Sequence, residues 1–287
     1  MADLYIPTEE DIAFFQTNGY WLSPKLFDDE ELARLREHHA RVIAGDYETK
    51  RPPLSRNPEA GVVAPLVQVN NAYWTDGTIG RLVLDERLGA IAAHLAGVNG
   101  VRLWHDQLLL KLPQSDAQSN IGWHQDQGYW LSTDTKCAIT AWVAFDDVDE
   151  ENGCMEVVPQ SHTWNLLGEQ HFRFKNLEEQ EKRIAEKSGR PFASVPCILP
   201  AGCVSFHHSY TLHGSRANRS DRPRVSIAVH MIPDGTRFVG GTEGEGHTSN
   251  ILLQPKDGDF YAGPYFPVIY RKDDPLANVW KAGGVHT

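Results

Sequence analysis

Hydrophobic and polar positions change their spacing near residue 101. In the first hundred residues, apolar positions recur every three or four residues, as on one face of a helix. The stretch 8–19 begins with Thr-Glu-Glu and ends with Asn-Gly, which are capping signals for a short helix. The stretch 28–39 opens with four acidic residues, and 82–95 precedes a glycine. These stretches predict three helices, and 48–65, rich in Pro and Gly, is expected to be a loop.

From residue 101 onward the apolar positions are typical of strands. Residues 101–112 have the composition of a buried strand and are followed by a proline, and residues 137–148 alternate between two faces. Residues 203–215 form a further predicted strand, and Pro223 begins a return strand, so we expect these two strands to form a hairpin.

The two halves together predict a mainly β fold with flanking α-helices. We expect a single domain over residues 1–287, with N-terminal helices in 1–100 packed on a β core over 101–235. The charged, partly helical insertion 164–193 would suit a lid over the mouth of that core.

Charge and cysteine content narrow the partners and the location. Lys plus Arg is 27 and Asp plus Glu is 38, giving a formal charge of −11 without a basic stripe. Nucleic acid and anionic membranes are therefore not expected partners. The chain shows no apolar run of membrane-spanning length and no secretory signal, and its four cysteines form no C-x-x-C pair. These features predict a cytoplasmic protein with reduced thiols.

The stretch 122–130, Gly-Trp-His-Gln-Asp-Gln-Gly-Tyr-Trp, holds the first candidate chemistry. His124 and Asp126 are two residues apart, so they share a face of an extended segment. Two histidines and one carboxylate on one face form the metal site of non-haem Fe(II) oxygenases. A lone His-x-Asp triplet arises often by chance, so the prediction depends on a third ligand. His38 and His39 lie on a charged helix and are expected at its surface.

The strand 203–215 offers three candidates for the third ligand: His207, His208 and His213. His207 and His213 are six positions apart, so side-chain alternation does not separate them. Arg224 opens the return strand and shares one face with Ser226, Ala228 and His230.

An arginine near such a metal fits a 2-oxo acid co-substrate. The 2-oxo acid chelates Fe(II) at one end, and its far carboxylate needs a fixed bidentate cation, which arginine supplies better than lysine. Ser215 and Ser226 could donate hydrogen bonds to the same carboxylate.

These segments resemble the phytanoyl-CoA dioxygenase family of Fe(II)- and 2-oxoglutarate-dependent oxygenases. The matching pieces are Trp123-His124-Gln125-Asp126-Gln127, Ala141-Trp142-Val143-Ala144, Glu151-Asn152-Gly153-Cys154-Met155, Val158-Pro159-Gln160-Ser161-His162, and His213-Gly214-Ser215 with Asn218 and Arg224. One departure is Gln160, which stands where the family usually has glycine. The resemblance implies a double-stranded β-helix, a cupin-like jelly roll, with helices on its outer side.

The resemblance also implies roles for single residues. By analogy iron would be bound by His124, Asp126 and His213, which selects His213 over His207. The distal carboxylate of 2-oxoglutarate would be held by Arg224 and Ser215, in a pocket lined by Gln125, Trp142 and Gln107.

The implied activity is a dioxygenase that uses Fe(II), 2-oxoglutarate and O₂ and releases succinate and CO₂. Halogenating relatives have Gly or Ala at the carboxylate position, so Asp126 predicts a hydroxylase and not a halogenase. The expected partner is a small-molecule substrate of unknown identity. The protein is expected to be a monomer or a homodimer. Tyr129 and Trp130, just past the ligands, are candidate walls of its pocket. The competing hypotheses are a non-catalytic cupin-like metal- or ligand-binding protein and a Zn(II) hydrolase.

Overall fold

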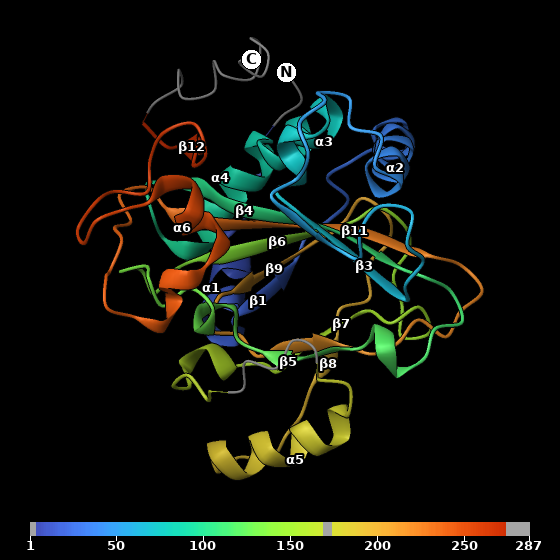
Figure 1. Ribbon diagram of the computed structural model, residues 1–287. Coiled ribbons are helices and arrows are strands. Elements are labelled where there is room, and N and C mark those ends of the chain that lie inside the picture. The colour runs from blue at the N-terminus through green and yellow to red at the C-terminus, as the bar shows by residue number, and fades with distance from the viewer. Residues whose placement is uncertain (1–3, 169–173, 274–287) are drawn as a thin grey trace.

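Two antiparallel sheets form the centre of the protein in the computed structural model, which describes residues 4–168 and 174–273 (Figure 1). The larger sheet has the order β1-β9-β6-β11-β4-β3-β2, with β12 also paired to β4, and the smaller has the order β5-β10-β7-β8. The prediction of a mainly β jelly roll with flanking helices is therefore confirmed.

The strands of the larger sheet are β1 (Tyr20–Leu22), β2 (Ser55–Asn57), β3 (Leu66–Asn70), β4 (Gly100–Lys111), β6 (Ile139–Ala144), β9 (Val204–His208), β11 (Arg224–Pro233) and β12 (Val268–Arg271). Those of the smaller sheet are β5 (Ile121–His124), β7 (Met155–Val157), β8 (Val195–Pro196) and β10 (His213–Ser215). The α-helices are α1 (Glu9–Asn18), α2 (Asp29–Ala44), α3 (Gly77–Val83), α4 (Glu86–Ala96), α5 (Leu177–Ser188) and α6 (Thr248–Leu253). Short 3-10 turns are η1 (Ala72–Trp74), η2 (Ala117–Ser119), η3 (Asp126–Gly128), η4 (Ser161–Thr163) and η5 (Glu243–Gly246).

The first two helices begin and end where the capping signals predict. Thr8 and Asp28 each form a capping box, and Gly19 and Gly45 end the helices with φ of 78° and 85°, which glycine adopts readily. The helix predicted over 82–95 is instead two helices, because the Asp85 side chain caps the second one.

Helices α1 to α4 cover the outer face of the larger sheet, where the main apolar core lies (Figure 1). The prediction that His39 lies at the surface is wrong. It is buried against the sheet, its Nε2 lies 3.1 Å from the Leu109 carbonyl, and burial lowers its pKa to about 4. His38 is half-buried, with Nδ1 2.7 Å from Asp76. The high charge of the helix did not show that His39 lies on its inner face, because a charged amphipathic helix still buries one side.

The predicted strand 203–215 is two strands that belong to different sheets. β9 pairs with β6 and β1 in the larger sheet, whereas β10 pairs with β5 and β7 in the smaller. The expected hairpin with the return strand is also wrong, since β11 pairs with β4 and β6. The chain crosses between the sheets over residues 209–212, so His213 and Arg224 reach the interior from opposite sides.

Segments outside 101–235 also build the larger sheet. β1, β2 and β3 come from the N-terminal hundred residues, with β2 inside the predicted loop 48–65, and β12 comes from near the C-terminal end of the described chain. Helix α5, from the insertion 164–193, lies against β5 of the smaller sheet (Figure 1). Residues 169–173 of that insertion lie outside the described residues.

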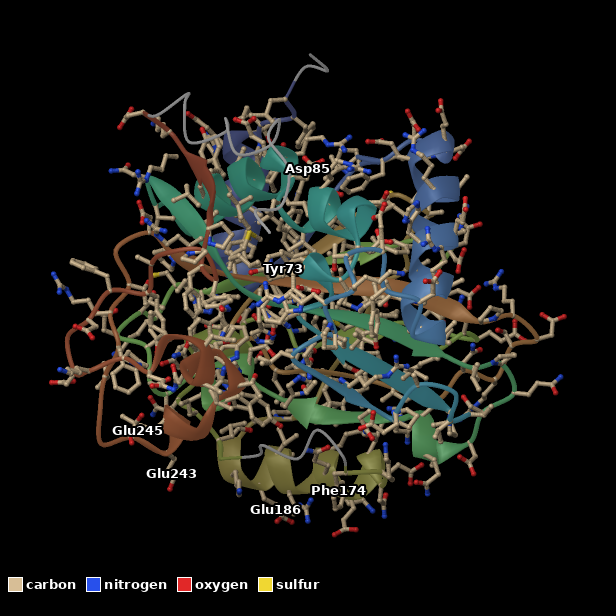
Figure 2. All side chains as sticks on the ribbon, turned by 45° about the horizontal axis from the view of Figure 1, so that its top comes forward. Tyr73, Asp85, Phe174, Glu186, Glu243 and Glu245 are labelled. Atoms are coloured by element: carbon tan, nitrogen blue, oxygen red, sulfur yellow. The ribbon has the colours of Figure 1, made fainter. Side chains whose placement is uncertain are left out.

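The side chains separate clearly into an interior and a periphery. Tyr73 is buried inside, whereas Glu186, Glu243 and Glu245 point outward from their elements (Figure 2). None of the helices in the described chain combines the length and apolar character needed to cross a membrane.

Candidate active site

A cavity lies between the two sheets. Side chains from both sheets line it: His124, Ile121, Met155, His213 and Ser215 from the smaller, and Gln107, Leu109, Thr140, Trp142, His207, Arg224, Ala228 and His230 from the larger, with Asp126 between them. The predicted metal ligands and the predicted arginine therefore share one space.

Three potential metal ligands converge at this cavity. His124 ends β5, Asp126 begins η3, and His213 begins β10, directly opposite His124 in the β5–β10 pairing. Asp126 Oδ1 lies 3.5 Å from His124 Nε2 and 3.6 Å from His213 Nε2. All three residues are buried, and their ligand atoms lie within 4.8 Å of one another.

Backbone contacts fix which nitrogen of each histidine faces the cavity. His124 Nδ1 lies 2.7 Å from the Gly122 carbonyl, and His213 Nδ1 lies 2.9 Å from the Thr211 carbonyl. A carbonyl only accepts, so each Nδ1 carries a proton, and each Nε2 is the nitrogen that faces Asp126 and the cavity. This is the orientation that metal-binding histidines take.

The other oxygen of Asp126 is held by residues of the larger sheet. Thr140 Oγ1 donates to Oδ2 over 2.9 Å, and His207 Nε2 lies 3.4 Å from the same oxygen. Burial alone would raise the pKa of Asp126, but the His213, His124 and His207 imidazoles hold it well below its usual range. The carboxylate is thus ionised, with Oδ1 left toward the two histidines.

The geometry separates His213 from the rival ligands, which alternation did not. Neither ring nitrogen of His207 has a hydrogen-bond partner among the described residues, so no backbone carbonyl fixes its orientation. It contacts Oδ2 of Asp126, whereas His213 faces Oδ1. His208 does not line the cavity, and its Nδ1 accepts a hydrogen bond from the Tyr210 backbone N–H.

Arg224 lies deeper in the same cavity and is 1 % exposed. Its guanidinium donates to the Gly153 carbonyl, its Cζ lies 5.2 Å from the centre of the Trp142 ring, and its Nε has no partner among the described residues. Burial lowers its pKa to about 10, so it remains a cation at neutral pH. Within residues 4–168 and 174–273, no carboxylate forms an ion pair with it. A buried cation without a carboxylate partner among these residues suits a bound anion.

Lys111 is a functional candidate that the sequence did not reveal. It is the cross-strand neighbour of Arg224, is fully buried, and donates to Ser215 Oγ over 2.7 Å and to the Arg216 carbonyl. Burial, then repulsion by Arg224, lowers its pKa well below the usual range. Two buried basic groups therefore lie on paired strands, Arg224 in the cavity lining and Lys111 in contact with Ser215, which also lines it. The sequence feature that could have indicated Lys111 is its position four residues after Gln107 on β4, which places both side chains on the same face of the strand.

The other predicted co-substrate residues are placed less uniformly. Gln107, Trp142 and Ser215 line the cavity. Gln125 is not among the residues that line the cavity. Its side-chain amide donates to the Tyr210 carbonyl and accepts from the Leu167 backbone N–H. Ser226 is buried, and its hydroxyl lacks a partner in the described part of the chain.

A jelly roll that holds two histidines and a carboxylate beside a buried arginine defines the class of iron- and 2-oxoglutarate-dependent dioxygenases. The family model described as "Phytanoyl-CoA dioxygenase (PhyH)" matches residues 15–226. The chain belongs to the phytanoyl-CoA dioxygenase family.

Curated relatives agree with this assignment. A protein of Stutzerimonas stutzeri described as a probable alpha-ketoglutarate-dependent hypophosphite dioxygenase is 27% identical over 235 residues, covering 77% of this chain and 78% of the relative. The peroxisomal phytanoyl-CoA dioxygenase of Bos taurus is 23% identical, covering 94% of this chain and 80% of the relative.

Solved structures give the same picture. The carbocyclase SnoK from nogalamycin biosynthesis superposes with a TM-score of 0.71 at 25% identity, covering 92% of this chain and 97% of that one. The epimerase SnoN, in complex with Fe3+, alpha ketoglutarate and nogalamycin RO, gives 0.68 at 26% identity, covering 91% and 98%. The class predicted from the sequence is therefore confirmed, and the non-catalytic alternative is not supported.

Proposed function

We propose that the protein hydroxylates a small organic molecule, with 2-oxoglutarate converted to succinate and CO₂. His124, Asp126 and His213 would hold Fe(II), which when bound supplies the oxidising chemistry with O₂. The observation that carries the proposal is Arg224, a buried cation with an unpartnered Nε in the cavity that the three ligands border. A dicarboxylate that also reaches the metal satisfies both features.

The chain's own residues position that co-substrate. Arg224 would bind the distal carboxylate, and Ser215 would add a hydrogen bond. Ser215 Oγ already accepts from Lys111, so its hydroxyl proton remains available for donation. Gln107 and Trp142 would form the pocket walls. A Zn(II) hydrolase would give the buried Arg224 no partner, so this alternative has less support.

Hydroxylation is proposed over other outcomes because the carboxylate ligand is present. Two structural relatives are described as an epimerase and a carbocyclase, so the fold supports several oxidations. Asp126 fills the position that a halide would need, and hydroxylation requires no further group from the protein. The acyl-CoA of the family name is not proposed as the substrate. A cytoplasmic location and a monomeric or homodimeric state stay predictions.

Anaerobic titration with Fe(II) and 2-oxoglutarate tests the proposal. We expect a visible charge-transfer band that needs both components, followed by succinate formation when O₂ is admitted. Asp126→Ala should abolish hydroxylation, and Arg224→Ala should chiefly raise the 2-oxoglutarate concentration needed for the band. Well-folded protein that gives neither band nor succinate would refute the proposal, and wild-type succinate yield from Asp126→Ala would refute the ligand set.

A further inference from the structure

Four neighbouring strands place a row of polar side chains opposite the metal ligands. His105 on β4 pairs with His230 on β11, His230 with Thr140 on β6, and Thr140 with His207 on β9. All four residues are buried, on the inner face of the larger sheet. Three histidines in one row of a jelly-roll interior are costly unless something satisfies their nitrogens.

The hydrogen bonds of Thr140 determine the tautomer of His230. An ionised carboxylate only accepts, so the Thr140 hydroxyl proton is committed to Asp126 Oδ2. His230 Nδ1 lies 2.8 Å from the same hydroxyl oxygen and must therefore donate its proton to it. The remaining nitrogen of neutral His230, Nε2, is then a lone-pair acceptor. It is buried without a partner in the described chain, on a residue that lines the cavity.

A second unpartnered nitrogen lies beside the first. The His105 ring centre is 4.3 Å from that of His230, and His105 Nε2 also has no partner among the described residues. Trp130 contacts both imidazoles, with ring centres 5.1 Å from His230 and 5.9 Å from His105. Of these three rings His230 lines the cavity, and His105 and Trp130 pack against it, so the two unpartnered nitrogens lie together on the side of the cavity away from Arg224.

The charges of the cavity indicate a neutral occupant. Among the described residues that line the cavity, only Asp126 and Arg224 have side chains that are ionised at neutral pH. In the proposed function Asp126 binds the metal and Arg224 binds the co-substrate. A charged substrate group next to His230 would lack a counter-charge in the described chain. A hydroxyl group fits, since it can donate to His230 Nε2 and either donate to or accept from His105.

We propose that His230 and His105 recognise neighbouring hydroxyl groups of a neutral, polyol- or sugar-like substrate, with Trp130 against its carbon frame. This inference rests on the proposed function, because it places the substrate beside the metal ligands. His230 and His105 are here specificity-determining residues. The metal would be held by His124, Asp126 and His213 instead.

The test uses cyclohexanediol with adjacent hydroxyls as the probe and its dimethyl ether as the matched control. Protein with nitrogen-labelled histidine, loaded with Zn(II) and 2-oxoglutarate, is titrated with each compound. We expect saturable movement of the His230 Nε2 resonance toward the hydrogen-bonded position with the diol and none with the ether. His230→Phe should weaken diol binding about ten-fold, and His230→Gln, which retains an acceptor, should restore most of it.

The outcomes distinguish this inference from the proposed function. The Fe(II)- and 2-oxoglutarate-dependent band of the wild-type protein reports the proposed function alone. If the band forms but the ether binds as well as the diol, or the diol leaves the His230 resonance unmoved, the inference is overturned and the proposed function stands. If the band does not form, both are overturned. If His230→Phe does not fold, the wild-type titration and His230→Gln decide.

Discussion

Replacing Lys111 by methionine separates a binding role from a structural one. Lys111 is fully buried, donates to Ser215 Oγ and the Arg216 carbonyl, and lies beside Arg224 on the neighbouring strand. Two like charges about 8 Å apart would repel by about 2 kcal/mol at an effective dielectric constant near 20. The folded protein therefore holds two basic groups together at a cost that a bound dicarboxylate would offset.

The magnitudes follow from these contacts. Losing the ammonium removes one charge-assisted interaction from the co-substrate end, worth about 1.5–3 kcal/mol, or about 10- to 100-fold in 2-oxoglutarate affinity. In the metal-free protein, Ser215 Oγ and the Arg216 carbonyl lose their donor, which costs about 1–3 kcal/mol of stability. The substitution also removes the repulsion by Arg224 and the burial of a basic group, and this gain is of similar size. We therefore expect Lys111→Met to change the free energy of unfolding by less than about 1 kcal/mol.

The assay is a pair of titrations on the same protein. Affinity comes from anaerobic titration of the Fe(II) protein with 2-oxoglutarate, and stability from urea unfolding of the metal-free protein. Lys182→Met, at an exposed position of α5, is the matched control and should change neither quantity. If Lys111→Met lowers stability by more than about 2 kcal/mol and leaves the affinity unchanged, Lys111 only supports the fold and the reasoning is wrong.

Three further predictions test the site and the fold. Thr140→Val removes the donor to Asp126 Oδ2 and should weaken Co(II) affinity by about 10-fold or more, measured by competition with a chelating dye, while unchanged affinity would contradict the role of Thr140. Burial lowers the pKa of His39 from 6.5 to about 4, so the unfolded chain binds the extra proton and stability falls as the pH drops through this range. In urea titrations, His39→Gln should reduce the proton uptake on unfolding near pH 5 by about one, and an unaltered slope would argue against a neutral His39. Gln160→Gly should stabilise the protein by about 0.5–1 kcal/mol because Gln160 has φ of 66°, whereas Gln160→Ala, which keeps the left-handed strain, should not.

Much of the fold followed from local signals. The capping residues of α1 and α2 and the apolar run of β4 were sufficient to place those elements to within a few residues. The family resemblance supplied the jelly roll, and it also pointed to the turn at Gln160, where the usual glycine is missing but the left-handed conformation is retained. Local patterns work here because caps, turns and alternation are properties of neighbouring residues.

The crossing between the sheets could not be predicted in the same way. Residues 209–212, Ser-Tyr-Thr-Leu, contain neither glycine nor proline, so nothing in the local pattern ends β9 before β10 begins. The turn is held by two hydrogen bonds: the Thr211 hydroxyl donates to the Gly19 carbonyl, and the Leu212 backbone N–H donates to the Ser161 hydroxyl. Both partners are far away in the sequence. Periodicity therefore grouped His207 with His213, although they belong to opposite walls of the cavity.

The same limit explains why the sequence indicated the predicted metal ligands but not the residues that support them. His124 and Asp126 carry a recognisable spacing, and the family resemblance selects His213, so the sequence can indicate all three. Lys111 and Thr140 act through contacts, such as those to Ser215 and Asp126, that exist only once β4, β6 and β11 are in register. A lysine at a strand end and a threonine in a strand have ordinary structural explanations, and only burial and partners distinguish them. The residues that hold the geometry of the site are thus identified from the sheet register, whereas those predicted to bind the metal are identified from the sequence.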